Sequence, residues 1–143
     1  MTAIGEAGVA SLKQVSEWHR NAAPELDATV AAFTKKYPGK ENEYAYWRAK
    51  TMWEMFAAAA KKAGSNDPAK VARAMEGMKM QTSLGDVEMR ADNHQILQPL
   101  FVSTLAKGVK YDSEDTGLGW KTDAKVDGKA TALPTTCKME RPK

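Results

Sequence analysis

The longest predicted helix of this chain lies in residues 43–68, which read EYAYWRAKTMWEMFAAAAKKAGSNDP. Apolar side chains recur along it at helical spacing and form one stripe: Ala45, Ala49, Met52, Phe56, Ala59, Ala60 and Ala63. Because such a stripe is normally buried, we expect a helix from about Glu43 to Ala63 whose small alanines let it lie close against a sheet. Gly64 predicts the end of this helix, since glycine accepts the left-handed conformation of a C-terminal cap.

Three aromatic residues stand at the start of this helix: Tyr44, Tyr46 and Trp47. Tyr46 and Trp47 do not fall on the stripe, because they lie about 100° and 200° around the helix from Ala45. Helix N-termini and the loops that enter them often line ligand clefts in α/β folds, so these rings suit one wall of such a cleft. The alternative is that they pack on the preceding helix.

Two further helices flank the long one. Pro24 opens the first, which runs to Tyr37, and an apolar face recurs at steps of four, three and four: Leu26, Val30, Phe33 and Tyr37. Downstream, the sequence Ser65-Asn66-Asp67-Pro68 predicts the start of another helix, with an N-terminal capping residue followed by proline at the first helical position. This second helix is expected to break at Gly77.

The remaining pattern predicts strands, and the fold class is therefore α/β. Weak alternation favours a strand over residues 9–18, and a period of two predicts another over residues 78–90. The sequence Asp92-Asn93-His94 indicates a turn, and residues 96–105 would complete a β-hairpin. From Gly108 the chain is polar and turn-rich, and its last ~20 residues are expected to be loosely held. We expect one domain, with helices packed on a small sheet plus the hairpin.

Composition narrows the classes of function. The chain has 143 residues, 43% apolar and 27% charged, with a net charge of +3. This charge is too small and too evenly spread to favour nucleic acid, and no apolar run approaches the ~20 residues of a membrane span. The first residues, MTAIGE, show neither the basic nor the apolar region of a signal peptide, so no export signal is expected in this chain. The single cysteine, Cys137, is interpreted as a free thiol whose role stays open.

Signatures of catalysis are largely missing, and we do not expect an enzyme. No nucleophile elbow, phosphate loop or dinucleotide fingerprint occurs. His19, His94 and Cys137 are too scattered for a zinc site, and the acidic residues of 112–115 lack the glycine and glutamate that a calcium loop needs. No metal or cofactor is therefore predicted. Glu17, beside Trp18, or Asp92 would carry the acid-base chemistry of an alternative small enzyme.

Several of these segments together resemble a known family. They are Tyr46-Trp47, Met52 to Ala63, Gly64 to Pro68, Val71 to Gly77, Thr82 to Val87 and Asp92-Asn93-His94, with Trp18, Pro24 and the helix to Tyr37 upstream. The combination resembles the C-terminal part of type I periplasmic substrate-binding proteins of ABC importers, in the leucine/isoleucine/valine-binding family. The resemblance covers about residues 4 to 126. We therefore divide the chain into residues 1–126, the C-terminal portion of a leucine-binding-protein-like domain, and residues 127–143, a polar tail.

The resemblance implies part of a Venus-flytrap protein, whose two α/β lobes close on a small ligand and pass it to a membrane permease. This chain would be a fragment of the solute-binding component for branched-chain or related amino acids, working in the periplasm and contributing one wall of the cleft. Tyr46 is the best match to the family's ligand-contacting aromatic residue, with Tyr44 and Trp47 as neighbours. A missing N-terminal portion would hold the polar groups that bind the ligand's ammonium and carboxylate. The alternative is a truncated structural or self-associating module without ligand binding of its own.

Overall fold

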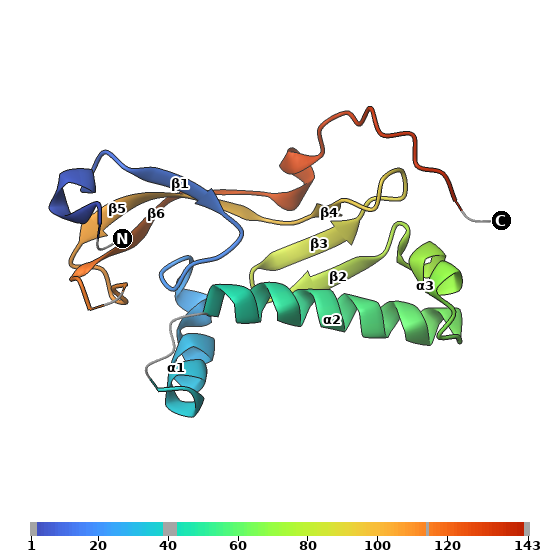
Figure 1. The fold of residues 1–143 in the computed structure, drawn as a ribbon, viewed down its shortest axis with the longest axis horizontal. Helices are drawn as coiled ribbons and strands as arrows, with labels where there is room; N and C mark the ends of the chain where they lie inside the picture. Colours follow the sequence, from blue (N-terminus) through green and yellow to red (C-terminus); the bar gives the residue numbers. More distant parts are fainter. Residues whose placement is uncertain (1–2, 39–42, 114, 142–143) are drawn as a thin grey trace. The chain divides into compact units, whose positions relative to one another are not determined.

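The computed structural model describes residues 3–38, 43–113 and 115–141, and the side chains of residues 43–46 also lie outside its described part. The chain divides into two compact units (Figure 1). Met1–Trp47 and Leu100–Val126 form the first unit, and Arg48–Pro99 and Asp127–Lys143 form the second. Each unit is therefore built from segments that are distant in the sequence.

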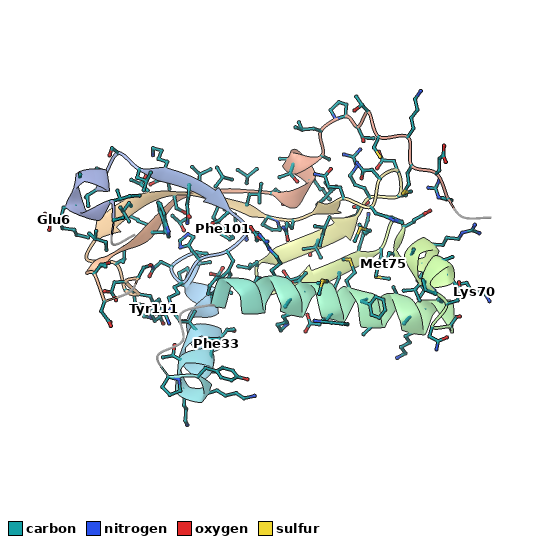
Figure 2. The ribbon with its side chains drawn as sticks, in the orientation of Figure 1. Glu6, Phe33, Lys70, Met75, Phe101 and Tyr111 are labelled. Carbon is teal, nitrogen blue, oxygen red and sulfur yellow. The ribbon has the colours of Figure 1, made fainter. Side chains whose placement is uncertain are left out.

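The first unit contains a three-stranded antiparallel sheet in the order β1-β5-β6. Its elements are η1 (Gly5–Gly8), β1 (Lys13–Ser16), η2 (Pro24–Leu26), α1 (Asp27–Lys36), β5 (Leu100–Lys107) and β6 (Leu118–Val126). Alternate residues of the central strand β5, Phe101, Ser103 and Leu105, are fully buried (Figure 2 labels Phe101). One face of β5 therefore carries much of the core of this unit.

Helix α1 buries only the first half of its predicted apolar face. Leu26 and Val30 are fully buried, which confirms the prediction for them. Phe33 is half-buried and Tyr37 is exposed, and their rings lie against each other with centroids 5.0 Å apart (Figure 2 labels Phe33). The core therefore covers only the first half of this apolar face, and at the last turn the rings of Phe33 and Tyr37 contact each other.

The second unit combines helices with a second three-stranded antiparallel sheet, in the order β2-β3-β4. Its elements are α2 (Glu43–Ala63), which begins in the first unit, α3 (Pro68–Met75), β2 (Lys79–Thr82), β3 (Gly85–Met89), β4 (Ile96–Leu97) and η3 (Gly128–Thr131). Its buried apolar side chains come from both helices and the sheet: Met55, Ala59, Val71, Leu84, Val87 and Leu97. The α/β class, with helices and small sheets, is confirmed.

Helix α2 has the predicted bounds, but a different face of it is buried. Residues at steps of four are shielded from solvent: Trp47, Thr51, Met55 and Ala59. In the predicted stripe, Met52 and Phe56 are instead 55% and 45% exposed, and the side chain of Ala45 lies outside the described residues. The prediction of the buried face is therefore wrong for Met52 and Phe56, whereas Ala59 of the predicted stripe is fully buried. Apolar residues cover more than one side of this helix, and spacing alone does not indicate which side meets the core.

The predicted turn after α2 is confirmed. Gly64 has φ +58°, the left-handed conformation expected of the cap. Asp67 Oδ1 accepts a hydrogen bond from the backbone N–H of Lys70 at 2.9 Å, and Pro68 occupies the first turn of α3.

The strands differ from the prediction in three places. The strand predicted over residues 78–90 is a hairpin of β2 and β3, whose turn is closed by Thr82: its Oγ1 donates to the carbonyl of Gly85 at 2.7 Å. The predicted strand over residues 96–105 is broken before Leu100, and its two parts, β4 and β5, belong to different sheets. Strand β6 was not predicted. The hairpin across Asp92-Asn93-His94 is confirmed, because β3 pairs with β4.

The C-terminal segment is attached to the second unit by hydrogen bonds. Arg90 Nη1 donates to the carbonyl of Leu133 at 2.6 Å, and Asn93 Nδ2 donates to Thr135 Oγ1 at 3.1 Å. Further along, Arg141 donates to the carboxylate of Glu76. The assignment of residues 127–143 as a separate polar tail stays a prediction.

Candidate ligand-binding site

Two tryptophans pack together where α2 begins. Trp18 follows β1, and Trp47 lies in the first turns of α2. Their ring centroids are 6.3 Å apart and their planes differ by 12°, so the indoles are stacked. Both side chains are buried, with 3% and 4% of their surface exposed. The pair therefore connects the start of α2 to the segment after β1.

The predicted ligand-binding residues are only partly described by the structure. The side chains of Tyr44 and Tyr46 lie outside the described residues. Trp47 is described, and its ring stacks on the ring of Trp18. Contact of these three aromatic residues with a ligand stays a prediction.

A buried polar cluster lies next to this pair and was not predicted. His19 Nε2 lies 2.9 Å from Ser103 Oγ and 3.1 Å from Thr122 Oγ1. Thr122 Oγ1 donates its single proton to a backbone carbonyl, that of Ala22 at 3.0 Å or that of Asn21 at 3.2 Å. Thr122 is then left to accept from the imidazole, which favours the tautomer with its proton on Nε2.

The surroundings keep this histidine neutral. Burial lowers the pKa of His19 from its ordinary value of 6.5 to about 4. With the proton on Nε2, the buried Nδ1 is a bare acceptor, and it has no hydrogen-bond partner among the described residues. Ser103 is fully buried, so this pair lacks the access that a nucleophile and its base would need. The cluster holds β5 and β6 against the segment after β1.

Asp92, one of the two acid-base candidates, is bound by an arginine. Arg90 binds the carboxylate of Asp92 through Nη2 at 2.5 Å and Nε at 2.8 Å. This hydrogen bond lowers the pKa of Asp92, which makes it a poor general acid at neutral pH. Glu17 is half-buried, and its role in acid-base chemistry stays a prediction.

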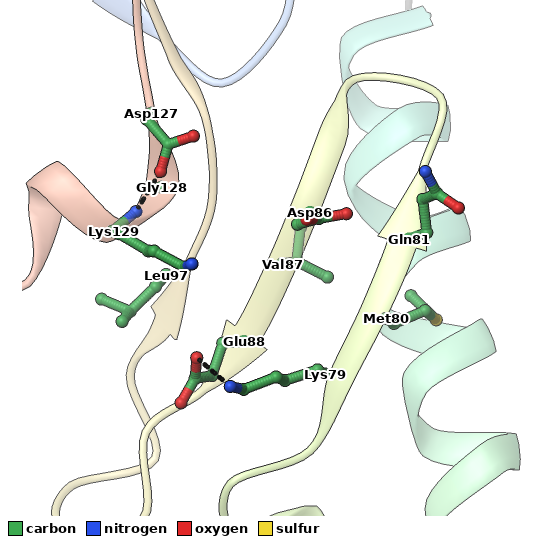
Figure 3. Close-up of a pocket in the computed structure, with 10 residues that line it drawn as sticks. All are labelled: Lys79, Met80, Gln81, Asp86, Val87, Glu88, Leu97, Asp127, Gly128 and Lys129. Atoms are coloured by element: carbon green, nitrogen blue, oxygen red, sulfur yellow. Dashed lines mark hydrogen bonds and ion pairs between the residues drawn. The ribbon is translucent and has the colours of Figure 1, made fainter.

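One hollow of about 290 Å³ lies within the second unit (Figure 3). Its walls are the sheet and the η3 segment, with Val87 and Leu97 as its buried apolar lining. Lys79 Nζ and Glu88 Oε2, which are cross-strand partners in β2 and β3, form an ion pair at 3.6 Å on the sheet side of the hollow. Charges of both signs line this hollow.

A second, larger and more open hollow of about 690 Å³ lies within the first unit. Four lysines line it: Lys107, Lys110, Lys121 and Lys125. Lys107 and Lys110 already form ion pairs, with Glu6 and Asp27, and the Nζ of Lys125 lies 5.8 Å from the centre of the Phe101 ring. Because carboxylates and a ring already engage three of the four ammonium groups, this hollow is not a strong anion site.

Two further properties follow from the described part of the chain. It contains no cluster of three or more histidine, cysteine, aspartate or glutamate side chains placed to hold a metal ion. Within the same residues, no helix combines the length and apolar character that crossing a membrane requires.

Comparison with known proteins identifies the family to which this chain belongs. Residues 1–110 match the family described as "Periplasmic binding protein". This match covers most of the chain, and the chain belongs to the periplasmic binding protein family. The resemblance inferred from the sequence, to a type I periplasmic substrate-binding protein of ABC transporters, is thereby confirmed.

Particular relatives refine this class. The chain is 26% identical over 147 residues to Leu/Ile/Val-binding protein homolog 4 of Brucella melitensis, which covers 97% of this chain and 35% of that protein. The leucine-, isoleucine-, valine-, threonine- and alanine-binding protein from Brucella ovis, in a closed conformation, has the same fold, with a TM-score of 0.78 and 21% identity. The match covers 99% of this chain and 37% of the Brucella ovis protein. A solute-binding protein from Rhodopseudomonas palustris HaA2, in complex with p-hydroxybenzoic acid, matches with a TM-score of 0.60 and 24% identity. This match covers 90% of this chain and 34% of the Rhodopseudomonas protein.

The chain spans about a third of the length of these relatives. It therefore corresponds to part of a periplasmic-binding-protein fold, as the sequence indicated.

Proposed function

We propose that this chain is part of the solute-binding component of an ABC importer for branched-chain or related amino acids. It acts by binding, without catalysis, and it works in the periplasm with a membrane permease. The family match over residues 1–110 carries this proposal. The name of the Brucella melitensis relative, a homolog of Leu/Ile/Val-binding proteins, supports the ligand class.

Within this function, Tyr46, Tyr44 and Trp47 contribute one wall of the ligand cleft. The stacked pair of Trp18 and Trp47 supports this role, because it holds the start of α2 in place and with it the residues just before Trp47. A rigid aromatic wall suits the apolar side chain of such an amino acid. The ammonium and carboxylate need hydrogen-bonded partners, since burying either charge alone costs several kcal/mol. Those partners belong to the two thirds of the fold outside this chain.

Ligand-dependent stability tests this proposal. Thermal unfolding of the chain, and of a version completed by the rest of the fold, is measured with leucine, isoleucine, valine, threonine, alanine and p-hydroxybenzoate. A ligand at a hundred times its Kd adds about 2.7 kcal/mol to the free energy of unfolding, so the melting temperature should rise. We expect Tyr46→Ala to abolish the rise in the completed protein and Trp53→Ala, on the same helix, to retain it. No rise with any of these compounds in the completed protein would eliminate the proposal.

A second candidate is a structural module that self-associates. The exposure of Met52, Trp53 and Phe56 on α2 favours it, because large apolar side chains on one helix face are normally covered. Light scattering over a range of protein concentrations tests this second candidate, and a monomer at every concentration would argue against self-association.

A further inference from the structure

The segment between β1 and η2, residues 17–23, belongs to no helix or strand, yet all seven residues are buried or half-buried. Trp18, His19 and Ala22 are at most 6% exposed. A turn closes within the segment, because the backbone N–H of Ala22 donates to the carbonyl of His19 at 2.9 Å. Since strand pairing does not hold residues 17–23, contacts with side chains and loops of the same unit fix their position.

Asn21, which lies in this turn, attaches the segment to the loop after β5. Its Nδ2 donates to the carbonyl of Tyr111 at 2.7 Å, and its Oδ1 accepts from the backbone N–H of Tyr111 at 2.9 Å (Figure 2 labels Tyr111). One side-chain amide thus satisfies both backbone groups of a residue 90 positions away, as a neighbouring strand would. These two hydrogen bonds are here named the Asn21 clamp.

Both ends of the Asn21 clamp are attached to β6. Thr122 Oγ1 lies 3.2 Å from the carbonyl oxygen of Asn21 and 3.0 Å from that of Ala22. At the other end, Gly119 lets the backbone of Tyr111 approach β6 closely, since a Cβ at Gly119 would lie 2.8 Å from the carbonyl oxygen of Tyr111. Because β6 holds both ends, the clamp fixes the turn of residues 19–22 in place.

Trp18 directly precedes this turn, and its ring stacks on the ring of Trp47 in the first turns of α2. The position of the turn therefore decides where the ring of Trp18 lies, and that ring supports the start of α2. We propose that Asn21 is a positioning residue for the aromatic wall of the ligand cleft, acting through Trp18 and Trp47. This role rests on the proposed function, in which Tyr46, Tyr44 and Trp47 form that wall.

Hydrogen exchange of the Trp18 indole tests the role of the clamp without any ligand. Trp18 Nε1 is buried and has no hydrogen-bond partner among the described residues, so its N–H exchanges with solvent only when the segment opens. We expect Asn21→Ala to speed this exchange at least ~10-fold in NMR spectra, since two hydrogen bonds are lost. Trp18→Phe identifies the resonance. The backbone N–H of Leu105, in the core of the same unit, should change less.

Tyr111→Phe is the matched control, because the clamp uses only the backbone of Tyr111. It should leave the exchange of the Trp18 indole unchanged. Equal acceleration at Trp18 and Leu105 in Asn21→Ala would overturn the proposal, since Asn21 would then stabilise the whole unit without positioning Trp18. An unchanged exchange rate at Trp18 would overturn it as well.

Ligand affinity tests the consequence for the cleft. Calorimetric titration of the protein completed by the rest of the fold, with each of the six compounds of the stability test, gives the Kd values. We expect Asn21→Ala to raise the Kd of each compound that binds about 10-fold and Tyr111→Phe to leave it unchanged, since a wall already in place loses less order on binding. Binding that Asn21→Ala does not weaken would overturn the role of Asn21 and leave the proposed function standing. If the unsubstituted completed protein binds none of the six, the proposed function fails and this role falls with it.

Discussion

The indole of Trp47 lies parallel to the indole of Trp18, with ring centroids 6.3 Å apart. The two residues come from different elements, the first turns of α2 and the segment after β1. Because both side chains are buried, their contact contributes apolar area as well as ring stacking to the first unit. The contact also holds the start of α2, where the predicted ligand-binding residues lie in the sequence.

Truncating this pair should strongly destabilise the protein. Trp47→Ala removes a buried aromatic side chain, so the free energy of unfolding should fall by about 3–5 kcal/mol. Chemical denaturation followed by circular dichroism measures this loss. Trp53→Ala is the control, since Trp53 is 62% exposed and should change stability by less than about 0.5 kcal/mol. Equal losses in the two variants would contradict the packing described for Trp47.

Stability should fall on mild acidification because of His19. Its pKa is lowered to about 4 in the folded protein and is 6.5 when unfolded, so between these values the unfolded chain binds more protons. Stability is therefore fully present above pH 6.5 and declines as the pH falls toward 4, by at most about 3 kcal/mol. Between pH 6.5 and 5 few carboxylates titrate, which makes this range diagnostic.

Denaturation midpoints at half-unit steps of pH measure this decline. His19→Asn keeps a hydrogen-bonding side chain and removes the titration, so its stability curve should be flatter from pH 6.5 to 5. If the parent protein and His19→Asn have parallel curves over this range, the histidine is not the group responsible.

Gly119 should tolerate no larger residue. A Cβ at this position would lie 2.6 Å from Val109 Cγ2 and 2.8 Å from the carbonyl oxygen of Tyr111. Since one of these neighbours is backbone, relief requires a shift of the chain, and Gly119→Ala should cost about 1–3 kcal/mol. Thermal unfolding checks this cost. Ala124→Ser, at an exposed position of the same strand, should be nearly neutral.

Arg141 should restrain the C-terminal segment. Its Nε donates to Glu76 Oε1 at 2.7 Å and its Nη2 donates to the carbonyl of Ala91 at 2.8 Å. We expect Arg141→Ala to speed hydrogen exchange in residues 132–141 and to leave the melting temperature of the protein nearly unchanged. The hydrogen bond from Arg141 lowers the pKa of Glu76, so the attachment should persist as the pH falls to the ordinary glutamate value and weaken only below it.

Lys138→Ala is the control for this segment, because Lys138 is exposed and close to Arg141 in sequence. Unchanged exchange in Arg141→Ala would show that other contacts, such as that of Arg90 with Leu133, are sufficient.

The candidate site was only partly predictable. The aromatic residues at the start of α2 stood out by their clustering, and their contact with a ligand stays a prediction. The cluster around His19 was not foreseen, because Ser103 and Thr122 approach it only through the pairing of β5 with β6. The adjacent pair Trp18-His19 was the only signal for it in the sequence.

The sequence by itself determined the features that depend on neighbours a few residues apart. The bounds of α2, the left-handed Gly64 and the Asp67 cap are of this kind, since helix periodicity and capping act within about one turn.

Only the tertiary structure decided which face of α2 is buried and which strand β6 pairs with. Met52 and Met55 are chemically identical, and their exposure differs because the rest of the second unit packs against only one side of the helix. Strand β6 does carry a period of two, because Trp120, Thr122, Ala124 and Val126 alternate with Lys121, Asp123 and Lys125, and the sequence analysis did not use it. That β6 pairs with β5 in the first sheet is a property of the folded chain and not of any short segment.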